Sequence, residues 1–219
     1  MQTVPETQLI QFENWTLRVR ESDHPNARLL LLIHGFTGDE NSMWVFARDL
    51  PEHYWIVAPR APYTEETGGY SWRSSRFGNL DEPGLDWLRQ SAEALIRLVD
   101  AYSSSVRIDA SVFDVMGFSQ GAGVCNVLTF LHPQRVRKTG ILAGFVPSGL
   151  EELVSGRPLE GKPFFVAHGT KDETVPVERA RESIALLEQA GAQVTSCEDD
   201  VAHKVSMTCL RALKQFLTD

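Results

Sequence analysis

The stretch VFDVMGFSQGAGVCNVLTFL, at residues 112–131, carries an apolar run, a glycine-flanked serine and a second apolar run. Residues 112–116 predict a β-strand buried on both faces, and Gln120–Leu131 predicts a helix. The pentapeptide GFSQG, at residues 117–121, lies at their junction. Such a turn holds Ser119 in a strained backbone conformation and leaves no room for side chains two positions away. The pattern favours Ser119 as a nucleophile over a glycine-rich turn that opens a helix around a phosphate.

Alternating strands and helices are predicted on both sides of this stretch. Strands are expected at residues 9–12, 15–20, 28–33, 55–58, 139–145, 163–168 and 194–197. Apolar residues at helical spacing predict helices at residues 41–50, 85–99, 177–187 and 205–216. This alternation predicts an α/β fold with a mostly parallel central sheet and helices on both faces. The long irregular stretch at residues 59–84 is typical of a functional loop.

Length, composition and charge exclude several classes of protein. A chain of 219 residues suits one domain spanning residues 1–219, and a hydrophobic content of 42% argues against disorder. A net charge of −8 with no run of basic residues argues against nucleic-acid binding. The longest apolar run, at residues 29–33, is far shorter than the roughly 20 residues of a membrane span. No Sec-type signal is visible at the N-terminus.

The cysteine pattern gives an expectation about redox state. Cys125, Cys197 and Cys209 are an odd number at scattered spacings. They predict neither a disulfide framework nor a zinc site. We therefore expect reduced thiols in a cytoplasmic protein.

A nucleophilic serine needs a general base, which in turn needs an acid to orient it. Where a serine is presented on a strand–turn–helix, the chain order is serine, then acid, then histidine. Of the histidines, His168 and His203 lie well beyond Ser119. His168 ends a predicted buried strand, where a histidine is more often structural. His203 follows the last predicted strand, at the sheet edge where catalytic groups gather, so we favour it over a helix N-terminal role.

The acid is expected in the loop after the strand at residues 163–168. Asp172 and Glu173 are the candidates there, whereas Asp199 and Asp200 are rivals because they are nearer to His203 in sequence. Asp172 is too far from the helix that starts near Val177 to act as its N-cap. Its position at a strand end favours Asp172 as the acid.

The tetrahedral intermediate of acyl transfer also needs hydrogen-bond donors for its oxyanion. The backbone N–H of Gln120, the residue after the candidate nucleophile, is one such donor at the start of a helix. The second is expected in the loop that follows His34-Gly35, where the N–H of Phe36 is the best candidate. One such donor is worth about 3 kcal/mol of transition-state stabilisation.

Taken together, these motifs resemble the phospholipase/carboxylesterase family of α/β-hydrolases from about Leu29 to the C-terminus. The resemblance rests on HGF at residues 34–36, GFSQGA at 117–122, HGTKDETVP at 168–176 and AHKVS at 202–206. It implies an α/β-hydrolase fold with no large cap domain, no cofactor and no metal. Two features depart from the family. Ala202 stands where a glycine is usual before the histidine, and residues 68–76 look closer to bacterial esterase-type members.

The same resemblance assigns roles to single residues. It implies Ser119 as nucleophile, Asp172 as acid, His203 as base, Phe36 and Gln120 as oxyanion donors, and an acyl pocket near Phe36, Trp72, Phe145 and Val175. The expected function is therefore a carboxylesterase that hydrolyses small to medium carboxylic esters through an acyl-enzyme. Acyl-protein thioesterase or lysophospholipase activity is the alternative, followed by a peptidase or a catalytically silent ligand-binding relative. The expected partner is a small-molecule ester, and the chain is expected to be a monomer or homodimer.

Overall fold

The computed structural model describes residues 6–48, 50–74 and 84–218. Its strands are β1 (Gln8–Phe12), β2 (Trp15–Arg20), β3 (Arg28–Ile33), β4 (Tyr54–Pro59), β5 (Tyr63–Thr64), β6 (Tyr70–Ser71), β7 (Phe113–Phe118), β8 (Val136–Leu142), β9 (Pro163–Gly169) and β10 (Gln193–Asp199). Its helices are α1 (Trp44–Ala47), α2 (Leu85–Val106), α3 (Gln120–Leu131), α4 (Val177–Gln189) and α5 (Met207–Thr218), with a 3-10 turn at Glu151–Gly156. The predicted alternation of strands and helices is therefore confirmed.

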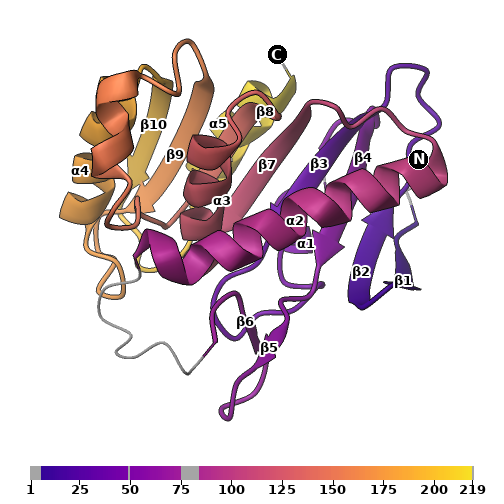
Figure 1. Cartoon of the computed structure of the whole chain (residues 1–219). Coiled ribbons are helices and arrows are strands. Elements are labelled where there is room, and N and C mark those ends of the chain that lie inside the picture. The colour runs from indigo at the N-terminus through magenta and orange to yellow at the C-terminus, as the bar shows by residue number, and fades with distance from the viewer. Residues whose placement is uncertain (1–5, 49, 75–83, 219) are drawn as a thin grey trace.

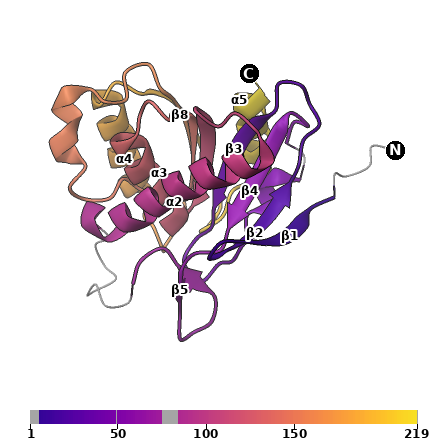
Figure 2. The same ribbon diagram turned by 45° about the vertical axis from the view of Figure 1, so that its right-hand side comes forward.

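Eight of the described strands form one sheet in the order β1-β2-β4-β3-β7-β8-β9-β10 (Figure 1). The six strands from β4 to β10 are mutually parallel, and β2 pairs antiparallel with both of its neighbours. The hairpin of β1 and β2 lies at one edge of the sheet (Figure 2), where residues 8–12 pair with residues 15–19. Because parallel strands share one carboxyl edge, the loops after β3, β7, β9 and β10 open on the same side of the molecule.

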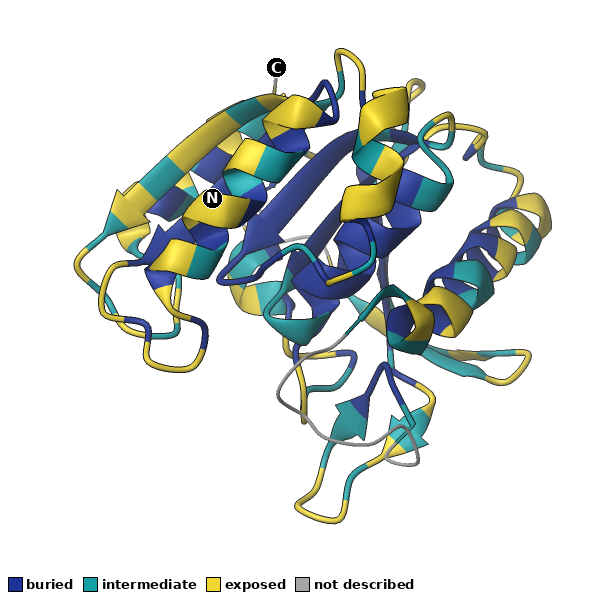
Figure 3. Cartoon of the chain, turned by 60° about the vertical axis from the view of Figure 1, so that its left-hand side comes forward, coloured by how far each residue is buried: buried dark blue, intermediate teal, exposed yellow. Residues whose placement is uncertain are grey.

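The sheet is covered on both faces. In β3, Leu29, Leu31 and Ile33 pack into one apolar cluster and Leu30 and Leu32 into another, as the twofold side-chain period of a strand requires. The first cluster includes residues of α2, α3 and α4, and the second includes residues of α1 and α5. Figure 3 shows the central strands almost wholly buried beneath helices with exposed outer surfaces. Continuous aliphatic strands are stable here because both faces are removed from water.

Several predicted elements differ from the structure in their bounds, and two of these differences have a clear physical cause. The helix expected at residues 41–50 is only the single turn α1, because Asp39 Oδ1 accepts hydrogen bonds from the Asn41 N–H and the Ser42 hydroxyl, both at 2.9 Å. Such local side-chain bonds compete with helix formation. The strand expected at residues 139–145 is β8, which starts earlier and ends at Leu142. It ends there because Ala143 takes a left-handed φ of 46°, which a strand cannot continue.

The expectation of three reduced thiols is wrong. Cys197 in β10 and Cys209 in α5 form a disulfide, and only Cys125 is a free, buried thiol. Cys197 and Cys209 are 12 residues apart in sequence with a Cα–Cα distance of 5.6 Å, so the bridge closes a short loop. Sequence spacing did not show this proximity, because it depends on α5 packing back against the end of the sheet. Cys125 lies wholly inside α3, and burial raises the pKa of its thiol.

Candidate active site

Four loops bring the predicted site residues together at the carboxyl edge of the sheet. Phe36 follows β3, Ser119 follows β7, Asp172 follows β9 and His203 follows β10. The last two loops are joined directly, since the Lys171 N–H donates a hydrogen bond of 3.0 Å to the Val201 carbonyl. Residues far apart in sequence therefore meet because of the strand order.

The turn between β7 and α3 has the strain that the sequence predicts. Ser119 has φ 53° and ψ −117°, a conformation that non-glycine residues rarely adopt. A Cβ on Gly117 would lie 2.3 Å from the Gly121 carbonyl oxygen, and one on Gly121 would lie 2.2 Å from the Ile33 carbonyl oxygen. Both distances are far inside van der Waals contact. Glycine is therefore required at both positions for the tight turn from β7 into α3 beside β3.

The side chains of Ser119, His203 and Asp172 form a continuous hydrogen-bonded row. The Ser119 Oγ lies 3.0 Å from His203 Nε2, and His203 Nδ1 lies 2.7 Å from Asp172 Oδ2. A carboxylate can only accept hydrogen bonds, so His203 Nδ1 carries the proton that it donates to Asp172. In the neutral imidazole, Nε2 then accepts a hydrogen bond from the Ser119 hydroxyl. The Asp172 side chain is fully buried, whereas His203 keeps 23% of its side-chain exposure. The row therefore leads from a buried charge to a serine that a ligand can reach.

The Asp172 carboxylate is held firmly in this position. Its Oδ1 accepts hydrogen bonds of 2.9 Å from the N–H groups of Thr174 and Val175, while Oδ2 faces His203. His168 Nε2 donates to the Val175 carbonyl at 2.8 Å and lies 3.4 Å from Asp172 Oδ2. His168 is thus a buried residue that supports the acid loop, as its strand-end position indicated.

The rival acids lie elsewhere. Glu173 is exposed, and Asp200 Oδ2 accepts a hydrogen bond of 2.8 Å from the Lys171 ammonium. Asp199 Oδ1 accepts from the Asp200 N–H at 2.8 Å. Hydrogen bonding from the Ser206 hydroxyl and the Asp200 N–H lowers the pKa of Asp199. Proximity in sequence to His203 was therefore a poor guide, because Asp199 and Asp200 form hydrogen bonds with other residues, whereas Asp172 bonds His203.

The backbone N–H groups of Phe36 and Gln120 are the predicted oxyanion donors. Within the described residues, neither the Phe36 N–H nor the Gln120 N–H donates a hydrogen bond to the protein. The Gln120 N–H is at the first residue of α3, where helical geometry leaves donors free. Both groups remain available for an anionic oxygen.

The side chain of Gln120 has a second role that sequence analysis missed. Its Oε1 accepts a hydrogen bond of 2.9 Å from the Trp72 N–H, and its Nε2 donates to the Ser71 hydroxyl at 3.0 Å. These bonds attach the segment after β6 to the start of α3. A polar side chain directly after the serine was the only available signal, and it does not reveal a partner 48 residues away.

His34 is a buried support for the loop that carries Phe36. Its Nε2 accepts a hydrogen bond of 3.0 Å from the Ala61 N–H, so Nδ1 carries the proton and donates to the Gly35 carbonyl at 2.7 Å. The residue is only 1% exposed, and burial lowers the pKa of its imidazole. The ring is therefore neutral and bonded on both sides.

The same loop is anchored by a charged pair. Glu40 is 2% exposed and accepts two hydrogen bonds, at 2.7 and 2.9 Å, from the Arg60 guanidinium. The hydrogen bonds from Arg60 lower the pKa of Glu40 despite its burial. Because Arg60 follows β4, the pair joins the loops after two neighbouring strands.

A cavity of about 310 Å³ opens beside Ser119, between the loop after β3 and α1. Its lining residues include Phe36, Met43, Val45, Phe46, Phe118 and His203. Of the residues predicted for a substrate pocket, Phe36 lines this cavity. Trp72, Phe145 and Val175 are buried and do not line it, so their contact with an acyl group stays a prediction.

The described residues contain neither a metal-binding cluster nor a membrane-spanning helix. No group of three or more His, Cys, Asp or Glu side chains in that part of the chain is arranged to bind a metal ion. No helix found there combines the length and apolar character needed to cross a membrane.

Residues 14–219 match the phospholipase/carboxylesterase family. The chain belongs to this family. The match covers all four loops of the site, and it confirms the resemblance inferred from the sequence motifs. The family places the chain among the hydrolases with an α/β-hydrolase fold.

Individual known proteins are similar to this one over almost the whole chain. Acyl-protein thioesterase 1 of Debaryomyces hansenii is 27% identical, covering 93% of this chain and 95% of the relative. A carboxylesterase of Mesorhizobium loti superposes with a TM-score of 0.82 at 20% identity, covering 97% of this chain and 98% of the other. A carboxylesterase of Bacillus cereus gives a TM-score of 0.81 at 22% identity, with 94% of each chain covered. The two structural likenesses confirm the predicted fold.

Proposed function

We propose that the chain is a serine carboxylesterase in which Ser119 is the nucleophile, His203 the general base and Asp172 the orienting acid. The observation that carries the proposal is the row Ser119–His203–Asp172, with hydrogen bonds of 3.0 and 2.7 Å. A hydroxyl at a strained strand–helix turn, an imidazole with its proton on Nδ1 and a buried carboxylate have the chemistry of acyl transfer.

In the proposed reaction, His203 Nε2 takes the proton of Ser119 as Oγ bonds to the ester carbonyl carbon. The carbonyl oxygen becomes an oxyanion that accepts from the N–H groups of Phe36 and Gln120. Asp172 stabilises the imidazolium. The tetrahedral carbon then expels the alkoxide, which takes the Nε2 proton and leaves as the alcohol. Water attacks the acyl-enzyme by the same route, releasing the carboxylic acid and restoring the Ser119 hydroxyl.

A fluorophosphonate probe, followed by peptide mapping, tests the nucleophile. The expected result is one adduct at Ser119, no labelling of Ser119→Ala, and a loss of p-nitrophenyl acetate turnover of about 10⁴-fold or more. Ser111→Ala is a matched control, because Ser111 is exposed and lies at the opposite end of β7. An adduct at another residue, or parental turnover by Ser119→Ala, would overturn the assignment.

Thioester hydrolysis is the second candidate activity. It is favoured by the relative of 27% identity that is named an acyl-protein thioesterase. The same Ser119–His203–Asp172 chemistry can cleave an oxygen ester or a thioester. Values of kcat/KM for an oxygen ester and a thioester of the same acyl group therefore distinguish the two activities. A small-molecule ester as substrate, a monomeric or homodimeric state and a cytoplasmic location stay predictions.

A further inference from the structure

The cavity beside Ser119 has an apolar side that continues directly from the imidazole of His203. The centroid of the Phe118 ring lies 5.0 Å from that of His203, and the Phe46 ring stacks on Phe118 at 5.8 Å with an interplanar angle of 25°. Met43 and Val45 complete the apolar lining. An aromatic row therefore leads away from the imidazole toward α1.

The cavity has apolar surface that no part of the described chain covers. Val45 is 69% exposed and Phe36 is 38% exposed, although both are large apolar side chains. Thr37 donates its hydroxyl to the Phe36 carbonyl at 2.6 Å, and Ser42 donates to Asp39 Oδ1 at 2.9 Å. The nearby hydroxyl protons are thus already used within the protein. Recognition in this cavity depends on apolar contact.

The proposed reaction fixes which part of an ester faces His203. The imidazolium proton on Nε2 must reach the oxygen of the departing alkoxide, so this oxygen lies within hydrogen-bond reach of His203. The acyl substituent occupies another position on the tetrahedral carbon. A cavity that starts at His203 and extends along Phe118 and Phe46 therefore receives the alcohol side.

We propose that this cavity binds the alcohol part of the substrate and selects an uncharged, apolar alcohol of small to medium size. The inference rests on the proposed ester hydrolysis and adds a substrate class to it. No Lys, Arg, Asp or Glu is among the described residues that line the cavity, so a phosphate or ammonium group would lose its hydration without a partner. A volume of about 310 Å³ is at the small end of ligand pockets. The site thus disfavours alcohols that carry a phosphorylated headgroup.

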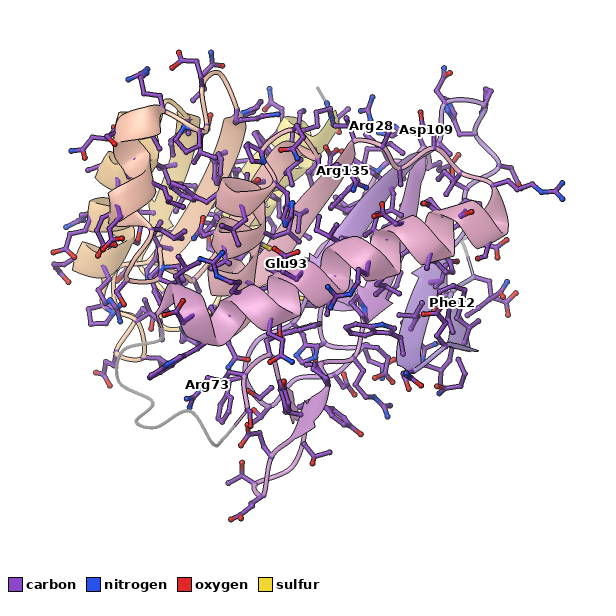
Figure 4. All side chains as sticks on the ribbon, in the orientation of Figure 1. Phe12, Arg28, Arg73, Glu93, Asp109 and Arg135 are labelled. Atoms are coloured by element: carbon purple, nitrogen blue, oxygen red, sulfur yellow. A yellow bond between two sulfur atoms is a disulfide. The ribbon has the colours of Figure 1, made fainter. Side chains whose placement is uncertain are left out.

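Two series of esters test the proposal in the wild-type protein and in Phe46→Ala. One series varies the alcohol of acetate esters from methyl to hexyl, and the other varies the acyl group of p-nitrophenyl esters. The expected result is that Phe46→Ala lowers the hexyl-to-methyl ratio of kcat/KM by about tenfold. Because all acetates form the same acetyl-enzyme, this ratio reports the alcohol side alone, and the ranking of acyl lengths in the p-nitrophenyl series is expected to stay the same. Phe12→Ala is the matched control, a half-buried aromatic in β1, the edge strand of the sheet (Figure 4).

A pair of substrates matched in shape but different in charge gives an independent test. 3,3-Dimethylbutyl acetate and acetylcholine have nearly the same shape, but the second carries a cationic alcohol. The wild-type protein is expected to prefer the neutral ester. Val45→Asp, at an exposed position that does not disturb the core, should move the ratio toward acetylcholine by about twofold to fivefold. Val112→Asp, at a residue 43% exposed before β7, is the control.

The outcomes separate the two proposals. If p-nitrophenyl acetate gives no burst and Ser119 is not labelled, the proposed function fails. If both are observed but Phe46→Ala changes the ranking of acyl lengths in the p-nitrophenyl series, the cavity binds the acyl group and this inference is overturned. An unchanged hexyl-to-methyl ratio, or an unchanged preference in Val45→Asp, contradicts it as well.

Discussion

The indole N–H of Trp72 donates a hydrogen bond of 2.8 Å to the carbonyl oxygen of His34. The backbone N–H of the same residue donates to Gln120 Oε1 at 2.9 Å. Trp72 therefore joins the loop that carries Phe36 to the first residue of α3, the two places where we propose oxyanion donors. Its side chain is fully buried, which explains how one aromatic residue can fix the separation of two loops.

Replacing Trp72 by Phe should disturb the site by removing the indole N–H while keeping an aromatic ring in the same place. The change leaves the buried His34 carbonyl without its donor, and we expect a loss of about 1–3 kcal/mol in the free energy of unfolding. A small shift of Phe36 is expected to lower kcat more than it raises KM. Trp15→Phe is the control, because the Trp15 indole N–H makes no hydrogen bond within the described residues. Equal kcat values for the two variants would contradict this role.

Gly121→Ala is expected to abolish the turn at Ser119. Its Cβ would lie 2.2 Å from the Ile33 carbonyl oxygen and 2.5 Å from that of His34, both backbone atoms that cannot move aside easily. We expect a destabilisation of about 3 kcal/mol or more and loss of fluorophosphonate labelling. Gly123→Ala is the matched control in the same helix, since its Cβ would meet only side-chain atoms, of Leu88 at 3.2 Å and of Pro147 at 3.5 Å. Normal labelling of Gly121→Ala would show that the turn can relax.

Asp172→Asn should separate the proposed acid from its rivals. The amide cannot hold the imidazole with its proton on Nδ1 as the carboxylate does, so kcat is expected to fall by about 10⁴-fold. Asp199→Asn and Asp200→Asn are expected to change kcat by less than about threefold, because their side chains bond elsewhere. The measurement is kcat for p-nitrophenyl acetate at one pH. A comparable loss in either control variant would contradict the assignment of Asp172.

Reduction of the Cys197–Cys209 disulfide should destabilise the loop that carries His203, which lies between the two cysteines in sequence. A crosslink that closes a loop of this size contributes about 2–4 kcal/mol. Dithiothreitol is therefore expected to lower the free energy of unfolding of the wild-type protein by this amount, with no effect on Cys197→Ser/Cys209→Ser. Thiol titration of the native protein provides the check. Cys125 should stay unreactive until unfolding because it is buried, whereas two reactive thiols before reduction would refute the bridge.

His34 makes stability depend on pH. Burial lowers its folded-state pKa below the ordinary 6.5, so the unfolded chain binds a proton first as pH falls. The free energy of unfolding should therefore decrease as pH falls below about 6.5, and this contribution should level off below the folded-state pKa. Protonation at Nε2 would also break the bond from the Ala61 N–H. In His34→Asn, the free energy of unfolding measured with urea should fall less steeply from pH 7 to pH 5 than in the wild-type protein. The same pH dependence in both proteins would contradict this role of His34.

Much of the architecture was predictable because local patterns report burial directly. The aliphatic run at Arg28–Ile33 and the apolar residues before Ser119 could only be strands covered on both faces. The bounds of α3 match the prediction because a glycine-bounded turn begins it. The helix predicted at residues 41–50 was too long. The side-chain hydrogen bonds of Asp39 compete with helix formation there, and the spacing of apolar residues does not reveal them.

The sequence by itself determined the order of the elements, the strained turn at Ser119 and a short set of candidate partners. Only the tertiary structure decided which acid faces His203, that Cys197 and Cys209 pair, and that the row of Phe118 and Phe46 borders the cavity. The physical reason is that strand order and helix packing bring together side chains separated by many residues. Local hydrophobic patterns record which face of an element is buried, but they do not record which distant side chain it meets.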